Sequence, residues 1–127
     1  MYKLSKRSTI NLSQTHTDLQ ILFHEVIKER DIAVICGHRG EKEQNEAYEK
    51  NFSKLKFPLS KHNKLPSLAV DVVPYPIDWT NIDRFEELGE FVLMKAKELK
   101  EAGKIKSNIT WGGNWKKFTD YPHYEIS

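Results

Sequence analysis

The stretch from Ile82 to Ala102 constrains the fold more than any other, because it is the longest helical pattern in the chain. Its apolar side chains recur at three- and four-residue intervals, which places them on one stripe of a helix. Gly103 follows directly and predicts where the helix stops. Such a stripe has to be buried against another layer of structure. Its members are Phe85, Leu88, Phe91, Val92, Ala96 and Leu99.

Short apolar runs elsewhere predict strands. The run "DIAVICG" (31–37) indicates a short buried strand bounded by Asp and Gly. The run "LAVDVV" (68–73) indicates an alternating strand that "PYP" ends. Later in the chain, "NITWGG" (108–113) and "HYEI" (123–126) are two further short candidates.

Two more helices are expected before the long one. Apolar spacing predicts a helix from about Leu12 to Arg30, with Ser13 or Thr15 as its cap, and 41–52 is rich in helix formers. The prolines and polar residues that follow 41–52 predict a loop up to the strand at 68–73. Helices mixed with short strands that need not be parallel indicate an α+β fold, a small antiparallel sheet packed with helices.

Composition narrows the class of protein. A chain of 127 residues predicts one domain (1–127), and 39% apolar with 30% charged residues is typical of a globular protein. A formal charge of +2 gives no strong basic field for nucleic acid. No signal peptide or membrane span is visible. The single cysteine, Cys36, lies in an apolar run and is expected to be a buried, inert thiol.

Asp71 interrupts an otherwise apolar run and is the first candidate for chemistry. A carboxylate buried there without partners costs several kcal/mol, so it needs a cation or strong donors. A salt bridge to Arg39 or a lysine would satisfy it, and so would exposure to solvent. The alternative is a metal ligand, with His62 folded back from the preceding loop.

His62, Asp71 and His123 together would leave one position of a zinc tetrahedron open for a catalytic water. Asp120, three residues before His123, would then lie close enough to take a proton from that water. The spacing of these residues is a weak signal alone. Ordinary packing or surface roles are expected for the other histidines, which are His16, His24 and His38.

Four blocks together carry a more specific signal: "CGHRGEKEQ", "SKHNKLPSLAVDVVPYPIDW", "WGGNW" and "DYPHYEI". From about residue 30 onward they resemble, in order, the zinc peptidases of the D-Ala-D-Ala carboxypeptidase and L-alanyl-D-glutamate endopeptidase family. The compact phage endolysins of that family are the nearest likeness. Two departures occur. Eight residues without a glycine separate His62 from Asp71, whereas the family often has a shorter gap that contains a glycine. In the "WGGNW" block, Asn114 occupies a position where the family more often has Asp.

The resemblance implies a zinc site in a cleft over the sheet, with Zn²⁺ as the cofactor and a metal-bound water activated by the base. It also implies that no side chain acts as a nucleophile, so Cys36 is not one. Core packing is favoured for Trp111 and Trp115. By position in the motifs, the zinc ligands are His62, Asp71 and His123, the base is Asp120, the oxyanion-stabilising cation is Arg39, and the cleft is lined by Gln44 and Ser60.

The function implied is an endolysin that hydrolyses the L-Ala–D-Glu bond of the peptidoglycan stem peptide. A D,D-carboxypeptidase on the same fold and a non-enzymatic zinc-containing binding module are the alternatives, and retention of Asp120 and Arg39 favours an enzyme. The expected partner is bacterial peptidoglycan, with no nucleic acid and no stable membrane association, for a monomer without a separate wall-binding domain. The expected location is the host cytoplasm before lysis, and the protein would act on the cell wall after the membrane is permeabilised.

Overall fold

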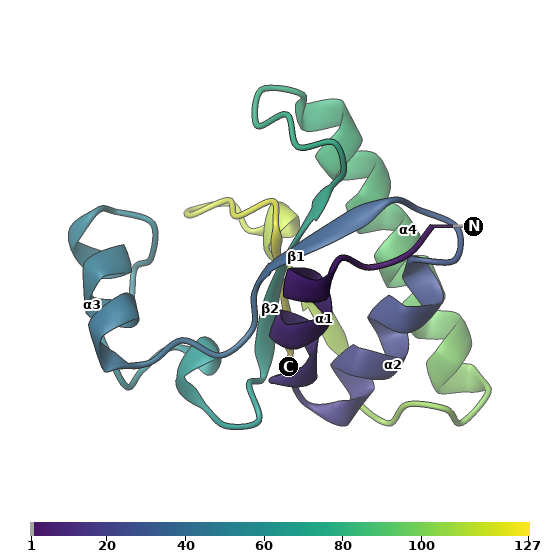
Figure 1. Ribbon diagram of the computed structural model, residues 1–127, viewed down its shortest axis with the longest axis horizontal. Coiled ribbons are helices and arrows are strands. Elements are labelled where there is room, and N and C mark those ends of the chain that lie inside the picture. The colour runs from purple at the N-terminus through teal and green to yellow at the C-terminus, as the bar shows by residue number, and fades with distance from the viewer. Residues whose placement is uncertain (1) are drawn as a thin grey trace.

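Four strands form one antiparallel sheet in the order β1-β2-β4-β3, in the computed structural model that describes residues 2–127 (Figure 1). This confirms the α+β class. The strands are β1 (Ile32–Cys36), β2 (Ala69–Pro74), β3 (Ile109–Trp111) and β4 (His123–Ile126). The helices are α1 (Lys6–Ser13), α2 (Thr17–Val26), α3 (Glu41–Glu49) and α4 (Ile82–Glu101), with short 3-10 turns η1 (Lys61–Asn63) and η2 (Gly112–Asn114).

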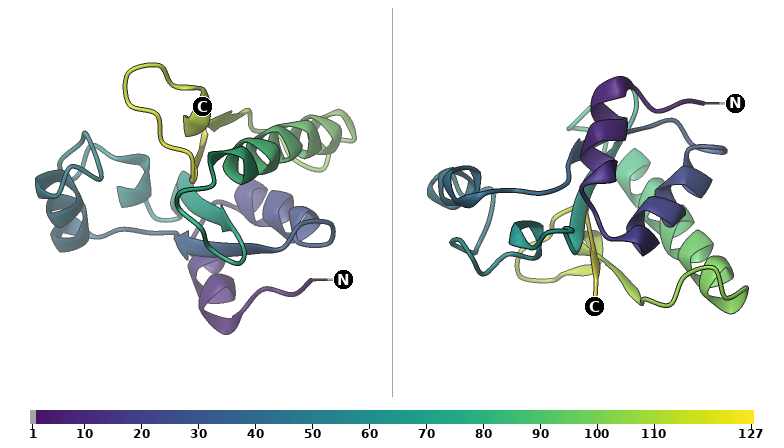
Figure 2. Two further views of the ribbon diagram at one scale, coloured as in Figure 1. Left: turned by 90° about the horizontal axis from the view of Figure 1, so that it is seen from above. Right: turned by 60° about the horizontal axis from the view of Figure 1, so that its bottom comes forward.

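Helix α4 is the predicted long helix, and its apolar stripe lies in the core with α1, α2 and the sheet. Asn81 caps its start by accepting a hydrogen bond from the backbone N–H of Arg84. In Figures 1 and 2, α1, α2 and α4 gather around the sheet, whereas α3 lies apart at the other end of the molecule. The space between α3 and the sheet is therefore outside the main core.

The predicted helix from about Leu12 to Arg30 is wrong in its bounds, because the chain breaks after Ser13 and only Thr17–Val26 forms the helix α2. Helix α1 lies almost wholly before the predicted range. Backbone bonds to Ser67 cause the break: Ser67 donates to the Gln14 carbonyl, and His16 donates to the Ser67 carbonyl. The cap of α2 is His16, whose Nδ1 accepts from the Asp18 N–H at 3.0 Å, rather than Ser13 or Thr15. A long-range contact thus overrides a continuous local pattern.

Strand β2 lies inside the sheet, between β1 and β4, and carries Asp71. Val70 and Val72 face the hydrophobic core, so alternation turns Asp71 to the opposite face of the sheet. Asp71 is paired with Cys36 of β1 on one side and with His123 of β4 on the other. A row of polar side chains therefore crosses the sheet on the face away from the core.

None of the helices formed by residues 2–127 combines the length and apolar character that a membrane crossing requires. The buried stripe of α4 is matched by charged residues on its exposed face, as in a surface helix of a globular protein.

Gly89 of α4 tests how tightly this core is packed, because a Cβ added there would overlap the indole ring of Trp111. Gly89→Ala in a helix interior would by itself stabilise a protein by about 0.5–1 kcal/mol. We expect instead a loss of about 1–3 kcal/mol in the free energy of unfolding, from overpacking. Urea denaturation followed by circular dichroism measures this, with Glu90→Ala on the exposed face as the control. A stabilised Gly89→Ala protein would contradict the close helix–sheet contact.

Candidate functional site

A cavity of about 910 Å³ lies over the face of the sheet that carries Asp71. One wall comes from the segment after α3, between Asn51 and His62. The opposite wall comes from the start of α4 and from the loop between Trp115 and Pro122. The floor includes the polar side chains Asp71, His123 and Glu125 of β2 and β4. Residues far apart in the sequence thus enclose one cleft.

Asp71 is the centre of the polar cluster on this floor. Its Oδ1 lies 3.2 Å from Nε2 of His62 and 3.4 Å from Nδ1 of His123. Its Oδ2 accepts from the guanidinium of Arg39 at 3.3 Å. The predicted salt bridge to Arg39 is therefore present, and two imidazoles converge on the other oxygen of Asp71. Its role as a metal ligand stays a prediction.

The outer nitrogen of each imidazole is held by an acceptor. His62 Nδ1 lies 2.8 Å from the Gly37 carbonyl, and His123 Nε2 lies 2.7 Å from Oε1 of Glu125. A carbonyl or carboxylate can only accept, so these nitrogens carry the protons. The other two nitrogens, His62 Nε2 and His123 Nδ1, face Asp71, and loss of a proton from each would free a lone pair for a metal. This is how metal-binding histidines are usually oriented.

The turn η1 places His62. Ser60 caps it: its hydroxyl accepts from the His62 N–H at 3.2 Å, while its own N–H donates to Asn63 Oδ1 at 3.0 Å. The backbone N–H of Arg39 donates to the His62 carbonyl at 2.8 Å. The position of the His62 ring is therefore set by the Ser60 cap and by the segment that follows β1.

Asp120 faces the same cluster from the opposite wall. Its Oδ2 lies 3.9 Å from His123 Nδ1, and about a quarter of its side chain is exposed, at 24%. Burial, together with the charge of Asp71, raises the pKa of Asp120 to about 6. Gly112 permits this approach, because a Cβ there would collide with the Asp120 carbonyl and press on His123. The carboxyl group is therefore poised to exchange a proton near neutral pH.

Charges inside the cluster reinforce one another. Burial lowers the pKa of His62, but the charge of Asp71 outweighs this and raises it to about 10. Burial also opposes ionisation of Asp71, yet His62 and His123 hold its pKa well below the ordinary value. For Glu125, burial is outweighed by His123 and Lys61, which lower its pKa. The site is a set of paired charges, and a metal that binds the histidines must displace protons from them.

Gln44 lies behind Arg39 rather than on the cleft surface, and none of its surface is exposed. Its Oε1 accepts from Arg39 Nη1 at 3.0 Å and from Asn63 Nδ2 at 3.2 Å. Its Nε2 donates to the Ser53 hydroxyl and to the Leu55 carbonyl. Gln44 therefore joins Arg39 to the wall after α3. Ser60, in contrast, does line the cavity.

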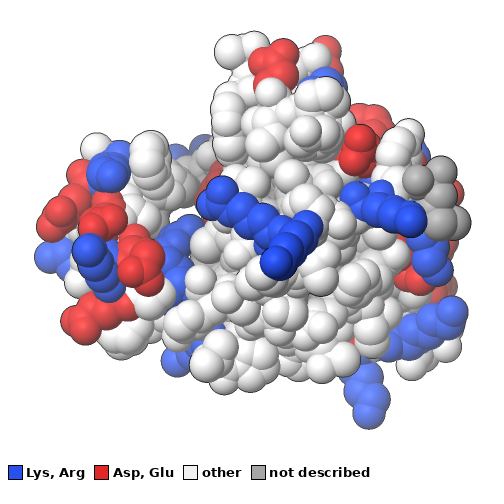
Figure 3. Space-filling view, viewed as in Figure 1, with Lys and Arg blue, Asp and Glu red and all other residues white. Residues whose placement is uncertain are grey.

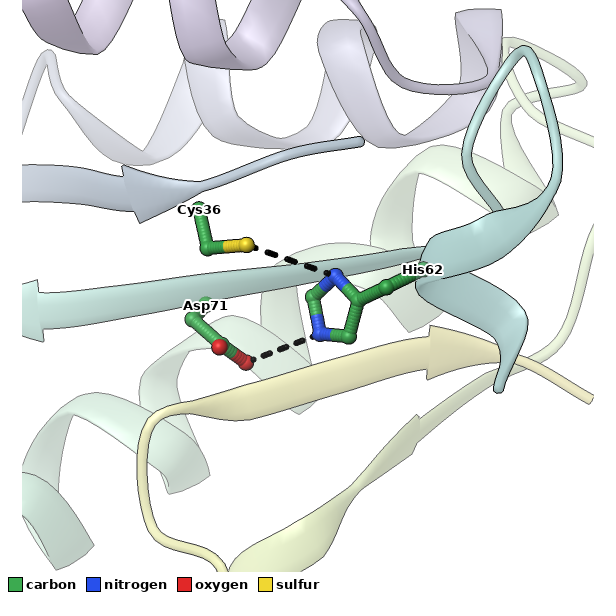
Figure 4. A group of neighbouring side chains, drawn as sticks. All are labelled: Cys36, His62 and Asp71. Carbon is green, nitrogen blue, oxygen red and sulfur yellow. Dashed lines mark hydrogen bonds and ion pairs between the residues drawn. The ribbon is translucent and has the colours of Figure 1, made fainter. Parts of the chain in front are cut away.

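Cys36 is where sequence reasoning missed a contact. The expectation of a buried thiol is wrong, because Cys36 is partly exposed. Its Sγ lies 3.8 Å from His62 Nδ1. Cys36, His62 and Asp71 lie close enough together to form a possible metal-binding group (Figure 4). In Figure 4, however, the thiol and the carboxylate approach opposite nitrogens of the ring. One ion cannot bind both nitrogens of one imidazole.

The two tryptophans of the "WGGNW" block have different environments. Trp111 is in the core, as expected, and its indole N–H donates to the Tyr121 carbonyl at 2.7 Å. The same expectation for Trp115 is wrong, because Trp115 lines the cleft and its ring centroid lies 5.1 Å from that of His123. No sequence signal separates the two. Among the other histidines, His16 caps α2, and His24 is exposed.

Comparison with known proteins agrees with the resemblance that the four sequence blocks indicate. The family model of the phage L-alanyl-D-glutamate peptidases matches residues 1–126. Among solved structures, the chain is similar to the L-Ala D-Glu endopeptidase ChiX of Serratia marcescens, with a TM-score of 0.79 and 27% sequence identity. That match covers 98% of this chain and 90% of the other.

The ligand set can be tested by metal content. If His62, Asp71 and His123 bind the ion, His62→Ala and His123→Ala should each abolish the roughly one zinc per chain expected of such a site. His24→Ala, on the exposed face of α2, is the matched control and should keep its zinc. Inductively coupled plasma mass spectrometry of the dialysed protein measures its zinc content, and circular dichroism checks that it is folded.

Cys36→Ser separates this ligand set from the group that contains the thiol. We expect it to retain zinc, because Cys36 lies on the Nδ1 side of His62, where the Gly37 carbonyl is already bound. Loss of zinc from Cys36→Ser with retention in His123→Ala would place the ion on the cysteine side instead.

Proposed function

Because the chain belongs to the phage L-alanyl-D-glutamate peptidase family, we propose that it is a zinc-dependent peptidoglycan endopeptidase that cleaves the L-Ala–D-Glu bond of the stem peptide. The observation that carries the proposal is the convergence of His62 Nε2 and His123 Nδ1 on one oxygen of Asp71. A carboxylate of the opposite wall, Asp120, lies beside this point in the same cleft.

The donor set suits zinc. Two imidazole nitrogens and one carboxylate oxygen are the ligands of several catalytic zinc sites, which keep a fourth position for water or substrate. Both imidazoles are oriented by acceptors on their outer nitrogens, at 2.8 and 2.7 Å. When bound, zinc supplies a water of pKa about 7 and polarises the carbonyl of the substrate.

Asp120 is proposed as the general base and acid. It would accept the proton of the attacking water and then deliver it to the nitrogen of the leaving amine. Its pKa of about 6, raised by burial and by Asp71, lets it hold and release a proton near neutral pH. Its side chain remains partly exposed to the cavity, so it can reach both water and substrate.

Arg39 is proposed to serve in two ways. One terminal nitrogen holds Asp71 Oδ2 at 3.3 Å, which leaves Oδ1 to the histidines, and the other is held by Gln44. A guanidinium has five N–H groups, so donors remain for a carbonyl oxygen on which negative charge develops. Loss of one such donor typically costs about 10²–10³ in turnover.

Peptidoglycan is the proposed partner, reached after the host membrane has been permeabilised. A near-neutral formal charge of +2 supports a partner other than nucleic acid. On the face in view in Figure 3, acidic and basic side chains are mixed over α3, and a short run of basic side chains lies near the middle of the main body. We propose that the chain acts as a monomer, because the whole ligand set comes from one chain.

Digestion of purified peptidoglycan, followed by mass spectrometry of the released peptides, tests the function. We expect peptides with a new D-Glu N-terminus, and we expect a chelator such as EDTA to abolish them and added zinc to restore them. The His123→Ala protein is the inactive control. Release of terminal D-Ala instead would make the protein a D,D-carboxypeptidase. Absence of any product from zinc-loaded protein would refute the enzyme proposal.

Asp120→Asn tests the base. The substitution keeps the size of the side chain and removes its ability to take a proton, so turnover should fall by about 10²–10⁴. Zinc content and thermal stability should stay near those of the unchanged protein, because Asp120 is not among the proposed ligands. Asp83→Asn, on the exposed first turn of α4, is the matched control. Near-full activity of Asp120→Asn would exclude Asp120 as the base.

A further inference from the structure

Three lysine and arginine side chains line the cleft, and two of them already pair with a carboxylate. Arg39 pairs with Asp71 at 3.3 Å, and Lys61 pairs with Glu125 at 2.9 Å. The third, Lys54, forms no ion pair with any carboxylate within residues 2–127. Its ammonium instead lies 5.4 Å from the ring centroid of Phe118. Lys54 is therefore the lining cation whose charge no side-chain carboxylate neutralises.

The backbone on either side of Lys54 is fixed from inside the protein. Gln44, which has no exposed surface, donates to the Ser53 hydroxyl at 2.9 Å and to the Leu55 carbonyl. The Ser53 hydroxyl also accepts from the Leu55 N–H at 3.1 Å. The same Gln44 holds Arg39 beside the cluster. The buried Gln44 side chain thus links the backbone beside Lys54 to Arg39 of the polar cluster.

Lys54 reaches across the cleft toward the wall that carries Asp120. Phe118 and Asp120 are two residues apart on one loop, a span of at most about 7 Å. Lys54, Phe118 and Asp120 all line the same cavity, so the ammonium and the proposed base belong to one cleft. A flexible four-carbon stem lets it move from the Phe118 ring to an incoming anion.

The substrate named by the family brings such an anion. In an L-alanyl-D-glutamate peptide, D-Glu supplies the nitrogen of the scissile bond. One of its carboxyl groups continues the peptide, so the other remains free as a carboxylate. That carboxylate enters a cleft in which Arg39 and Lys61 are already paired with Asp71 and Glu125. Lys54 is the lining lysine or arginine that remains to meet it.

We propose that Lys54 binds the free carboxylate of the D-glutamate and so makes the enzyme selective for an acidic residue on the leaving-group side of the bond. This inference rests on the function proposed above, and it adds a residue that determines specificity. The expected contribution is that of a hydrogen bond between charged groups, about 10- to 100-fold in kcat/KM. Most of it should appear in KM, since the carboxylate is not the reacting group.

The test compares two synthetic peptides that differ only at this carboxylate: one carries L-Ala–D-Glu, and the other has the free carboxyl replaced by a carboxamide. The unchanged protein should prefer the acid by about 10- to 100-fold in kcat/KM. Lys54→Met should cleave both at about the rate of the poorer one, and Lys54→Arg should keep the preference. The preference should also weaken as salt is raised, because the contact is exposed.

Lys56→Met is the matched control. Lys56 lies on the same loop, and its ammonium also rests over an aromatic ring, 5.1 Å from the centroid of Tyr48, but it does not line the cavity. It should leave the preference unchanged. Binding to the Asp120→Asn protein checks the preference independently of turnover. The acidic peptide should bind about 10- to 100-fold more tightly than the carboxamide, and adding Lys54→Met should abolish that difference.

The outcomes separate the two proposals. If the unchanged protein cleaves neither peptide, the proposed function fails and this inference fails with it. If it cleaves the acidic peptide preferentially and Lys54→Met keeps that preference, the role of Lys54 alone is refuted. Equal cleavage of both peptides by the unchanged protein would likewise refute it.

Discussion

A carboxylate on the middle strand of a small sheet is the constraint on which the rest of this structure depends. Asp71 has apolar neighbours on both sides along β2, and a buried carboxylate without partners is costly. Its two oxygens are accordingly divided between Arg39 on one side and two imidazoles on the other. Each partner comes from a different part of the chain, so the turn η1, the segment after β1 and strand β4 all have to meet at β2.

The partners of Asp71 are themselves held in turn. Gly37 and Glu125 fix the two imidazoles, Lys61 fixes Glu125, and Gln44 fixes Arg39. Such a network stabilises one geometry only when every member is satisfied. Outside this network, and among residues 2–127, the buried hydroxyl of Tyr124 has no hydrogen-bond partner. Burial raises the pKa of this hydroxyl. It lies on the core side of β4, away from the cleft.

The sequence predicts those features that repeat locally. The stripe of α4 and the short runs of β1 and β2 follow directly from periodicity, and the motif spacing selects the histidines and acids that the fold brings together. Features that depend on long-range contacts escape this reasoning. The break before His16 requires Ser67, and the burial of Gln44 requires the Ser53–Leu55 segment. The contact of Cys36 with His62, and the cleft position of Trp115, depend likewise on how distant segments pack.

The strand order also determines when the polar cluster can assemble during synthesis. Strand β4 is the latest element in the chain, yet it lies inside the sheet between β2 and β3. Until it emerges from the ribosome, β3 has no neighbour, β2 has an open edge, and His123 is missing from the cluster. The nascent chain therefore lacks the complete cluster until β4 has emerged from the ribosome. Sheet closure and assembly of the site are a single event.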